Sequence, residues 1–171
     1  PRALAIDTQD NIYVGESYQW PWTHARVLKF SASWSLIGWW GKGNRTSWWH
    51  DALTDEIPAG NGDNPGEFNY IFKITFDILG NMYVIDRWTY YDERGNLHQA
   101  SQDRIAQYDK SGNFLGWFYG YTPAWTWKSE AIQSFSDSGN TLLNDPSCII
   151  LRGEDMIIGN WNKHRIDVYD R

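Results

Sequence analysis

The sequence predicts an all-β protein made of repeated four-stranded antiparallel units. Short β-prone runs alternate with turns rich in Gly, Asp and Ser along most of the 171 residues. The same order of runs returns at fixed distances along the chain, which is the second observation behind this prediction. Apolar residues at alternate positions, as at Leu4 and Ile6 or at Ile12 and Val14, predict strands with a buried face. We name the four strands of a unit A, B, C and D in chain order.

Strands C and D form a predicted hairpin that occurs twice and begins a third time. Residues 105–108 are β-prone, residues 109–113 have turn chemistry, and residues 114–119 form a second apolar run. Residues 26–40 match this hairpin at an offset of 78 positions (104 − 26), and the pattern starts again at Arg165.

Strands A and B recur upstream of each hairpin. Residues 4–14 return as residues 74–84 at an offset of 70 positions (77 − 7), and a weaker third copy covers residues 149–158. The two offsets differ by eight residues (78 − 70), which lie between strands B and C of the second unit. The third unit stops after strand C, so its fourth strand is missing from the pattern.

Bulk properties exclude several classes of function. A formal net charge of −6 and a pI near 5.1 argue against a nucleic-acid partner, which would require a basic face. No run approaches the roughly 18 apolar residues of a membrane span, so we expect no membrane insertion. The single cysteine, Cys148, has no partner for an internal disulfide and no neighbour at zinc-site spacing. We expect it to pack within a strand.

Four-stranded antiparallel units repeated along a chain are typical of β-propellers. Five runs of the chain share a more specific pattern: Asp7–Val14, Asp77–Val84, Asp109–Leu115, Asn162–Asp170 and the linker Pro65–Phe68. They resemble NHL-repeat proteins, whose pattern reads D..GN.YV.D..N.RI..F...G.F, preceded by G...GEF..P.G. The resemblance implies a segment of a ring that is usually six-bladed. The chain departs from the family where strand A opens, since the family Gly is replaced by Ala3, Lys73 and Cys148, and where Ile71 replaces a Pro.

On this alignment the chain, residues 1–171, is a partial propeller of about two and three-quarter blades. The expected parts are blade 1 (1–41), an insertion (42–66), blade 2 (67–120) with a B–C insertion (87–103), an insertion (121–144) and partial blade 3 (145–171). Either a longer polypeptide supplies the remaining blades or several copies close a ring together. Both alternatives place blades or another protein partner against the two ends, because open ends expose apolar sides.

Two sets of residues recur at structural positions. Strand B closes on Glu16, Asp86 or Asn160, where the family usually has Asp, and strand C begins at Arg26, Arg104 or Arg165. We expect each acceptor to hold the nearby Arg and loop amides.

The sequence gives no support for a metal site or a cofactor. Three histidines, His24, His98 and His164, precede the recurring Arg in all three units. Equivalent positions on successive blades lie too far apart to share an ion within the ~2.1 Å bonds that zinc requires, so we expect these histidines to be structural.

Catalysis by these residues is also not expected. Catalytic six-bladed propellers, such as lactonases and lyases, place ligands where strand A starts. At that point the chain offers Arg2-Ala3, Phe72-Lys73 and Ser147-Cys148, which are poor ligands. A propeller enzyme of the lactonase or lyase type, with its catalytic residues outside this segment, stays an alternative.

Tryptophan is the unusual component, with 12 residues. Trp39, Trp40, Trp117 and Phe118 fall in strand D, and we expect them to pack between blades. Seven tryptophans fall in the B–C and D–A connections, which emerge on the same face of the ring: Trp20, Trp22, Trp48, Trp49, Trp88, Trp125 and Trp127. They either cover one another as an accessory core or form an aromatic recognition face for a protein or for sugar rings.

The sequence therefore predicts a non-catalytic protein-interaction or structural module, part of a larger protein or assembly. A glycan-binding module on the same face is the alternative of a different class. The triplet Asn44-Arg45-Thr46 is an N-glycosylation candidate at Asn44, and it favours an extracellular or periplasmic location.

Overall fold

The fold is all-β and antiparallel, as predicted. The computed structural model describes residues 1–17, 25–42, 49–51, 62, 66–87, 89–91, 97–99, 103–118, 143, 146–153, 155–161 and 164–170, without the side chains of 89–91, 97–99 and 170. These residues form fourteen strands and contain no α-helix.

The first sheet contains strands A to D in the predicted order and one more strand. Its strands are β1 (Ala3–Ile6), β2 (Ile12–Ser17), β3 (Ala25–Phe30), β4 (Leu36–Gly41) and β5 (Trp49–Asp51), hydrogen-bonded in chain order. The fifth strand was not predicted, since the repeat pattern places residues 42–66 in an insertion between two blades. Gly38 permits it: a Cβ there would lie 2.3 Å from the His50 carbonyl oxygen and from the Trp49 ring.

The second and third sheets follow the same order. The second contains β6 (Ile71–Phe76), β7 (Met82–Asp86), β10 (Arg104–Tyr108) and β11 (Phe114–Phe118). The third contains β12 (Pro146–Arg152), β13 (Asp155–Asn160) and β14 (Arg165–Asp170). Between β7 and β10, β8 (Thr89–Tyr91) and β9 (Leu97–Gln99) pair with each other, which the sequence analysis missed.

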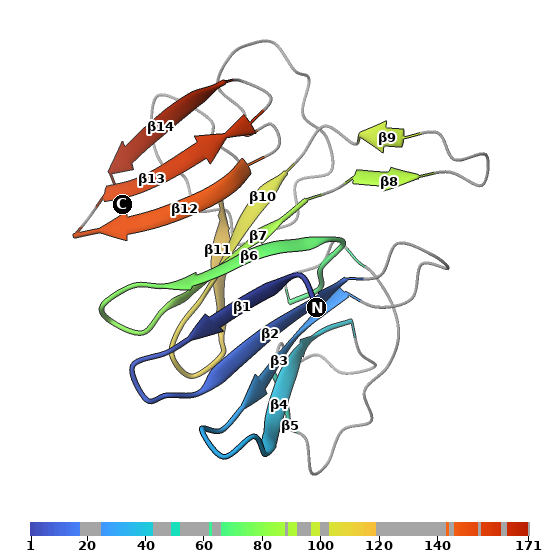
Figure 1. Cartoon of the computed structure of the whole chain (residues 1–171), viewed down its shortest axis with the longest axis vertical. Coiled ribbons are helices and arrows are strands. Elements are labelled where there is room, and N and C mark those ends of the chain that lie inside the picture. The colour runs from blue at the N-terminus through green and yellow to red at the C-terminus, as the bar shows by residue number, and fades with distance from the viewer. Residues whose placement is uncertain are drawn as a thin grey trace.

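The three sheets lie one against the next, with the second in the middle (Figure 1). Strand β6 contacts β1 and β2 on one side and β12 on the other. The turns that join β1 to β2, β6 to β7 and β12 to β13 lie on one side of the stack, and the β8–β9 hairpin lies on the opposite side (Figure 1). We call these the turn side and the connection side. No sheet closes on itself within the described ranges.

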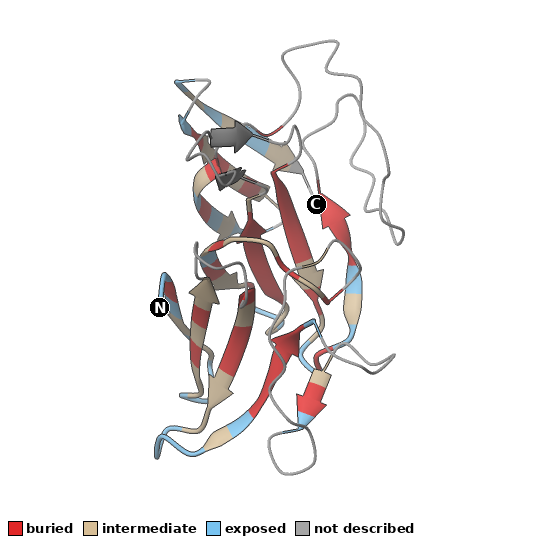
Figure 2. Ribbon diagram, turned by 90° about the vertical axis from the view of Figure 1, so that its right-hand side faces the viewer, coloured by how far each residue is buried: buried red, intermediate tan, exposed pale blue. Residues whose placement is uncertain are grey.

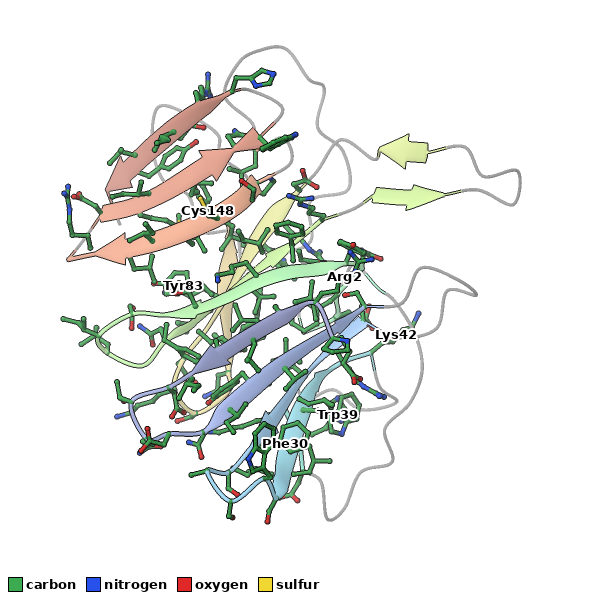
Figure 3. The ribbon with its side chains drawn as sticks, viewed as in Figure 1. Arg2, Phe30, Trp39, Lys42, Tyr83 and Cys148 are labelled. Atoms are coloured by element: carbon green, nitrogen blue, oxygen red, sulfur yellow. The ribbon has the colours of Figure 1, made fainter. Side chains whose placement is uncertain are left out.

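Two apolar clusters fill the spaces between the sheets. The first, between the first and second sheets, includes Tyr13, Trp40, Val84 and Trp117. The second, between the second and third sheets, includes Ile105, Phe118, Ile149 and Met156 among others. Figure 2 shows the buried positions on strands inside the stack, and Figure 3 shows Tyr83 between the second and third sheets.

The strand-D aromatic residues are buried, as predicted, but one of them packs elsewhere. Trp40 and Trp117 belong to the first cluster and Phe118 to the second. Trp39 instead stacks on His50 of β5, with ring centroids 3.8 Å apart. The prediction that Cys148 packs inside was wrong: it is exposed, because it lies on the outer face of the third sheet beside Gly159.

One five-residue turn recurs on the turn side and explains the regular spacing of the strands. The Asp7 carboxylate accepts hydrogen bonds from the amides of Gln9 (2.8 Å) and Asn11 (3.0 Å) and from the Asn11 side chain (2.9 Å). Asp77 and Asp109 head turns with the same bonds. Local carboxylate-to-amide bonds of this kind favour a turn over a continued strand.

The fourth position of each turn has a left-handed backbone. Its φ is 61° at Asp10, 84° at Gly80 and 90° at Gly112. The β3–β4 turn uses Ser31 in place of Asp and carries Trp34 at this position, with φ 65°. Residues other than Gly, Asn and Asp rarely adopt this conformation.

Candidate functional site

The polar residues that close strand B face those that open strand C, at the connection side of every sheet. The strand register places Glu16 opposite Arg26, Asp86 opposite Arg104, and Asn160 opposite Arg165. The pairs differ in burial and in bonding, so each is described separately.

The second-sheet pair is buried and fully engaged. Arg104 binds the Asp86 carboxylate through Nε (2.9 Å) and Nη2 (2.8 Å). The same carboxylate accepts the backbone amides of Asn69 (2.9 Å) and Tyr70 (2.7 Å). Burial raises the pKa of Asp86, and Arg104 with the two amides acts against that rise.

Arg104 also fixes the segment that leads into β6. Its guanidinium lies over the Trp117 ring, 3.9 Å from the centroid, and Nη2 donates to the carbonyl oxygens of Gly62 and Glu67 at 3.1 Å each. Asp86 binds backbone amides that precede β6, and Arg104 binds backbone carbonyl oxygens that precede β6. The pair therefore fixes the backbone before β6 through both its donors and its acceptors.

The first-sheet pair is more exposed. Arg26 donates to Glu16 at 2.8 Å through Nε and lies 2.7 Å from the same oxygen through Nη2. The neighbouring Ser17 hydroxyl accepts the amide of Ile71 at 2.7 Å, which ties the connection side of the first sheet to the second.

In the third sheet the arginine forms an ion pair with Asp167. Arg165 Nε lies 2.7 Å from Asp167 Oδ1, and the Asn160 side chain donates to Asp167 Oδ2 at 3.0 Å. The neutral Asn160 replaces the acid of the other two sheets, so Asp167 supplies the negative charge. The sequence pattern indicated the pair but gave no sign of this change.

A cation links the connection sides of the second and third sheets. Arg87 donates to the Pro146 carbonyl oxygen at 3.2 Å through Nε and at 2.9 Å through Nη2. Its guanidinium also lies over the Phe72 ring, 3.5 Å from the centroid. This region is therefore held by directional bonds as well as by apolar packing.

Trp49 is the one predicted aromatic-face residue within the described ranges. It lies in β5 and not in a loop, and its ring meets Trp40 edge-on at a centroid distance of 4.3 Å. It is half-buried against the first cluster. The other six residues of the predicted face, Trp20, Trp22, Trp48, Trp88, Trp125 and Trp127, and the candidate Asn44 lie outside the described residues.

Two exposed tryptophans were missed by the sequence analysis. Trp161 directly follows β13, at the connection side of the third sheet, and Trp34 lies in the β3–β4 turn on the turn side. The hairpin alignment could have singled out Trp34, since it occupies the position of Gly112 (112 − 34 = 78). For Trp161 the signal was its place immediately after Asn160, at the start of a B–C connection.

The histidines show no metal-type grouping in the part of the chain that is described. There, no three His, Cys, Asp or Glu side chains come close enough to hold an ion. His164 is exposed and has a left-handed backbone, whereas His24 and the side chain of His98 lie outside the described residues.

Comparison of the chain with known protein families and with curated proteins found no match. Among the described residues, no helix has the length and apolar character needed to span a membrane.

Proposed function

We propose that this chain is a segment of an NHL-like β-propeller and acts as a non-catalytic protein-interaction module within a larger protein or assembly. Its support is the repeated architecture: successive antiparallel sheets with strands in chain order, stacked with an apolar cluster in each space. The Asp-headed turns, and the residue pairs where strand B ends and strand C begins, recur at equivalent positions of successive sheets. This recurrence also supports a single repeating unit.

The interaction surface is the connection side, and exposed Trp161 carries this part of the proposal. Its side chain is 66% exposed, directly after β13. A tryptophan costs solubility when exposed, but it supplies large contact area with few rotatable bonds, which makes it a common anchor at protein interfaces. The sequence pattern predicts that the B–C and D–A connections, which contain six further tryptophans besides Trp49 of β5, emerge on this same side.

A rigid base is the second requirement of a recognition surface, since ordering loose segments on binding weakens affinity. The buried Asp86–Arg104 pair and the Arg87 bonds to Pro146 provide such a base at the connection side. The sheets therefore provide the rigid support, and the connections between strands contact the partner.

The test compares two tryptophans of equal exposure on opposite sides. Trp161→Ala removes the connection-side ring, and Trp34→Ala removes a ring that is 68% exposed on the turn side. We expect Trp161→Ala to weaken a captured protein partner by about thirtyfold, the equivalent of roughly 2 kcal/mol, with little change in unfolding free energy. Trp34→Ala should leave partner binding unchanged.

Binding that is insensitive to Trp161→Ala and to substitution of Trp20 and Trp125 would contradict the proposed surface. Titration with simple oligosaccharides at millimolar concentration separates the glycan alternative. Quenching of tryptophan fluorescence in the wild type, lost in Trp161→Ala, would favour glycan binding over a protein partner.

A further inference from the structure

The two end sheets expose apolar positions that are buried in the middle sheet. We call the face of a sheet that points toward the next sheet in the chain its forward face, and the other its back face. In the second sheet the forward face packs on the third sheet and the back face packs on the first. The forward face of the third sheet and the back face of the first have no such neighbour among the described residues.

The forward face of the third sheet carries two apolar rows. The register aligns Ile150, Ile157 and Val168 across β12, β13 and β14. The second row places Ile166 next to Gly159 and Cys148. Ile150, Ile166 and Val168 are exposed, and Ile157 is half-buried.

The equivalent positions in the second sheet are buried against a neighbouring sheet. Ile166 corresponds to Ile105 through the shared strand-C pattern (166 − 105 = 61). Ile105 is 0% exposed in the second cluster, whereas Ile166 is 72% exposed. Ile157 likewise corresponds to Tyr83, which is fully buried in that cluster (157 − 83 = 74).

The back face of the first sheet also exposes apolar residues. Leu4 and Ile6 of β1 are exposed, and their partners Val14 and Ile12 of β2 are half-buried. The residue of the second sheet that corresponds to Leu4 is Ile74, which is buried in the first cluster. On the same back face, Trp39 of β4 is buried against His50, so the exposed apolar area is concentrated on β1 and β2.

We propose that the forward face of the third sheet docks on the back face of the first sheet of a second copy of this chain. The inference rests on the repeat stacking proposed above, and it names the occupant of the two end faces. One chain carries both halves of an interface type that already occurs twice inside it, forward face against back face. A second copy therefore offers each end face the kind of surface that its counterparts bury.

The composition of the two faces fits this association. The exposed rows themselves are aliphatic. Charged positions flank them: Arg152, Asp155 and Asp170 at the turn end of the third sheet, and the paired Glu16 and Arg26 at the connection end of the first sheet. Contact between the aliphatic rows alone therefore buries no charge. Because different faces meet, the contact is head-to-tail, which closes a ring or continues as an open chain.

The experiment uses complementation between two single variants of the whole chain, followed by sedimentation equilibrium against the 20.0 kDa monomer mass. Ile166→Lys places a charge on the forward face, and Leu4→Lys places one on the back face. Each variant alone should raise the dissociation constant of self-association by at least about tenfold. A mixture of the two should form a mixed dimer, because Leu4→Lys keeps an intact third sheet and Ile166→Lys keeps an intact first sheet.

Ile78→Lys is the matched control. It makes the same substitution at an isoleucine that is 86% exposed at the tip of the β6–β7 turn, away from both end faces, and should associate as the wild type does. Circular dichroism of all variants checks that each chain is folded.

Three results would overturn the proposal: a wild type that is monomeric up to high micromolar concentration, a Leu4→Lys variant that associates normally, or a mixture that stays monomeric. The second result would indicate contact between two third sheets. Failure of this inference is distinguishable from failure of the proposed function, since the latter is measured with Trp161→Ala and a foreign partner.

Discussion

Removal of the Asp86 carboxylate should destabilise the chain far more than removal of Glu16, although both residues occupy the same position of the repeat. The Asp86 and Arg104 side chains are 1% and 7% exposed, whereas those of Glu16 and Arg26 are 32% and 21% exposed. Asp86→Ala leaves a buried guanidinium without its counter-charge and two amides without their acceptor. Breaking a buried pair in this way costs about 3 to 5 kcal/mol.

Glu16→Ala breaks a solvent-screened pair, and such pairs contribute about 0 to 1 kcal/mol. The assay is urea unfolding at neutral pH followed by tryptophan fluorescence, with the free energy of unfolding obtained by linear extrapolation. The double variant Asp86→Ala with Arg104→Leu removes the unpaired charge and should regain part of the loss. Equal costs for the two single variants, or a double variant less stable than Asp86→Ala, would refute the reasoning.

Three further predictions concern the turns. Partial burial raises the pKa of Asp109, but the bonds from Asn113 and the turn amides outweigh it and hold the pKa below its usual value. The stabilising contribution of this carboxylate is therefore present above about pH 4 and lost as pH falls through the lower folded-state pKa, so Asp109→Asn should cost more stability at pH 6 than at pH 2.5 in urea titrations. Trp34→Gly should raise stability by about 0.5 to 1 kcal/mol by relieving the φ of 65°, and Trp34→Ala should give no such gain; equal melting temperatures for the two variants would show that the backbone is not strained. Gly112→Ala should lower stability by about 1 to 2 kcal/mol, because φ is 90° and a Cβ would lie 3.2 Å from the Trp40 ring; an unchanged unfolding midpoint would exclude this close approach.

The regular strands were predictable because their signals are local. Alternation of apolar residues and the Asp-headed turns set both the existence of the strands and their order, and the structure keeps that order in all three sheets. Strand β5 was not predictable in this way, since it depends on β4 as a neighbour and on the missing side chain of Gly38. The β8–β9 hairpin had only its surplus length as a signal.

The polar positions were predictable as a pattern but not as contacts. The register brings each strand-B closing residue opposite its arginine, yet burial differs between Asp86 and Glu16. Among the described residues, only the second sheet has another sheet packed on each of its faces. Cys148 shows the same limit: alternation indicates which residues share a face, but exposure depends on whether another sheet covers it. The metal, cofactor, partner and location expectations stay predictions.

The stacking of the first and second sheets is the central claim, and one nuclear Overhauser experiment tests it most directly. The Trp40 indole N–H donates to the Gly112 carbonyl oxygen at 3.0 Å, across 72 residues of sequence. The account predicts strong cross-peaks between the Trp40 indole proton and the protons of Gly112 and Asn113 in the folded chain. A folded chain with assigned signals and no such cross-peaks would contradict the stacked arrangement.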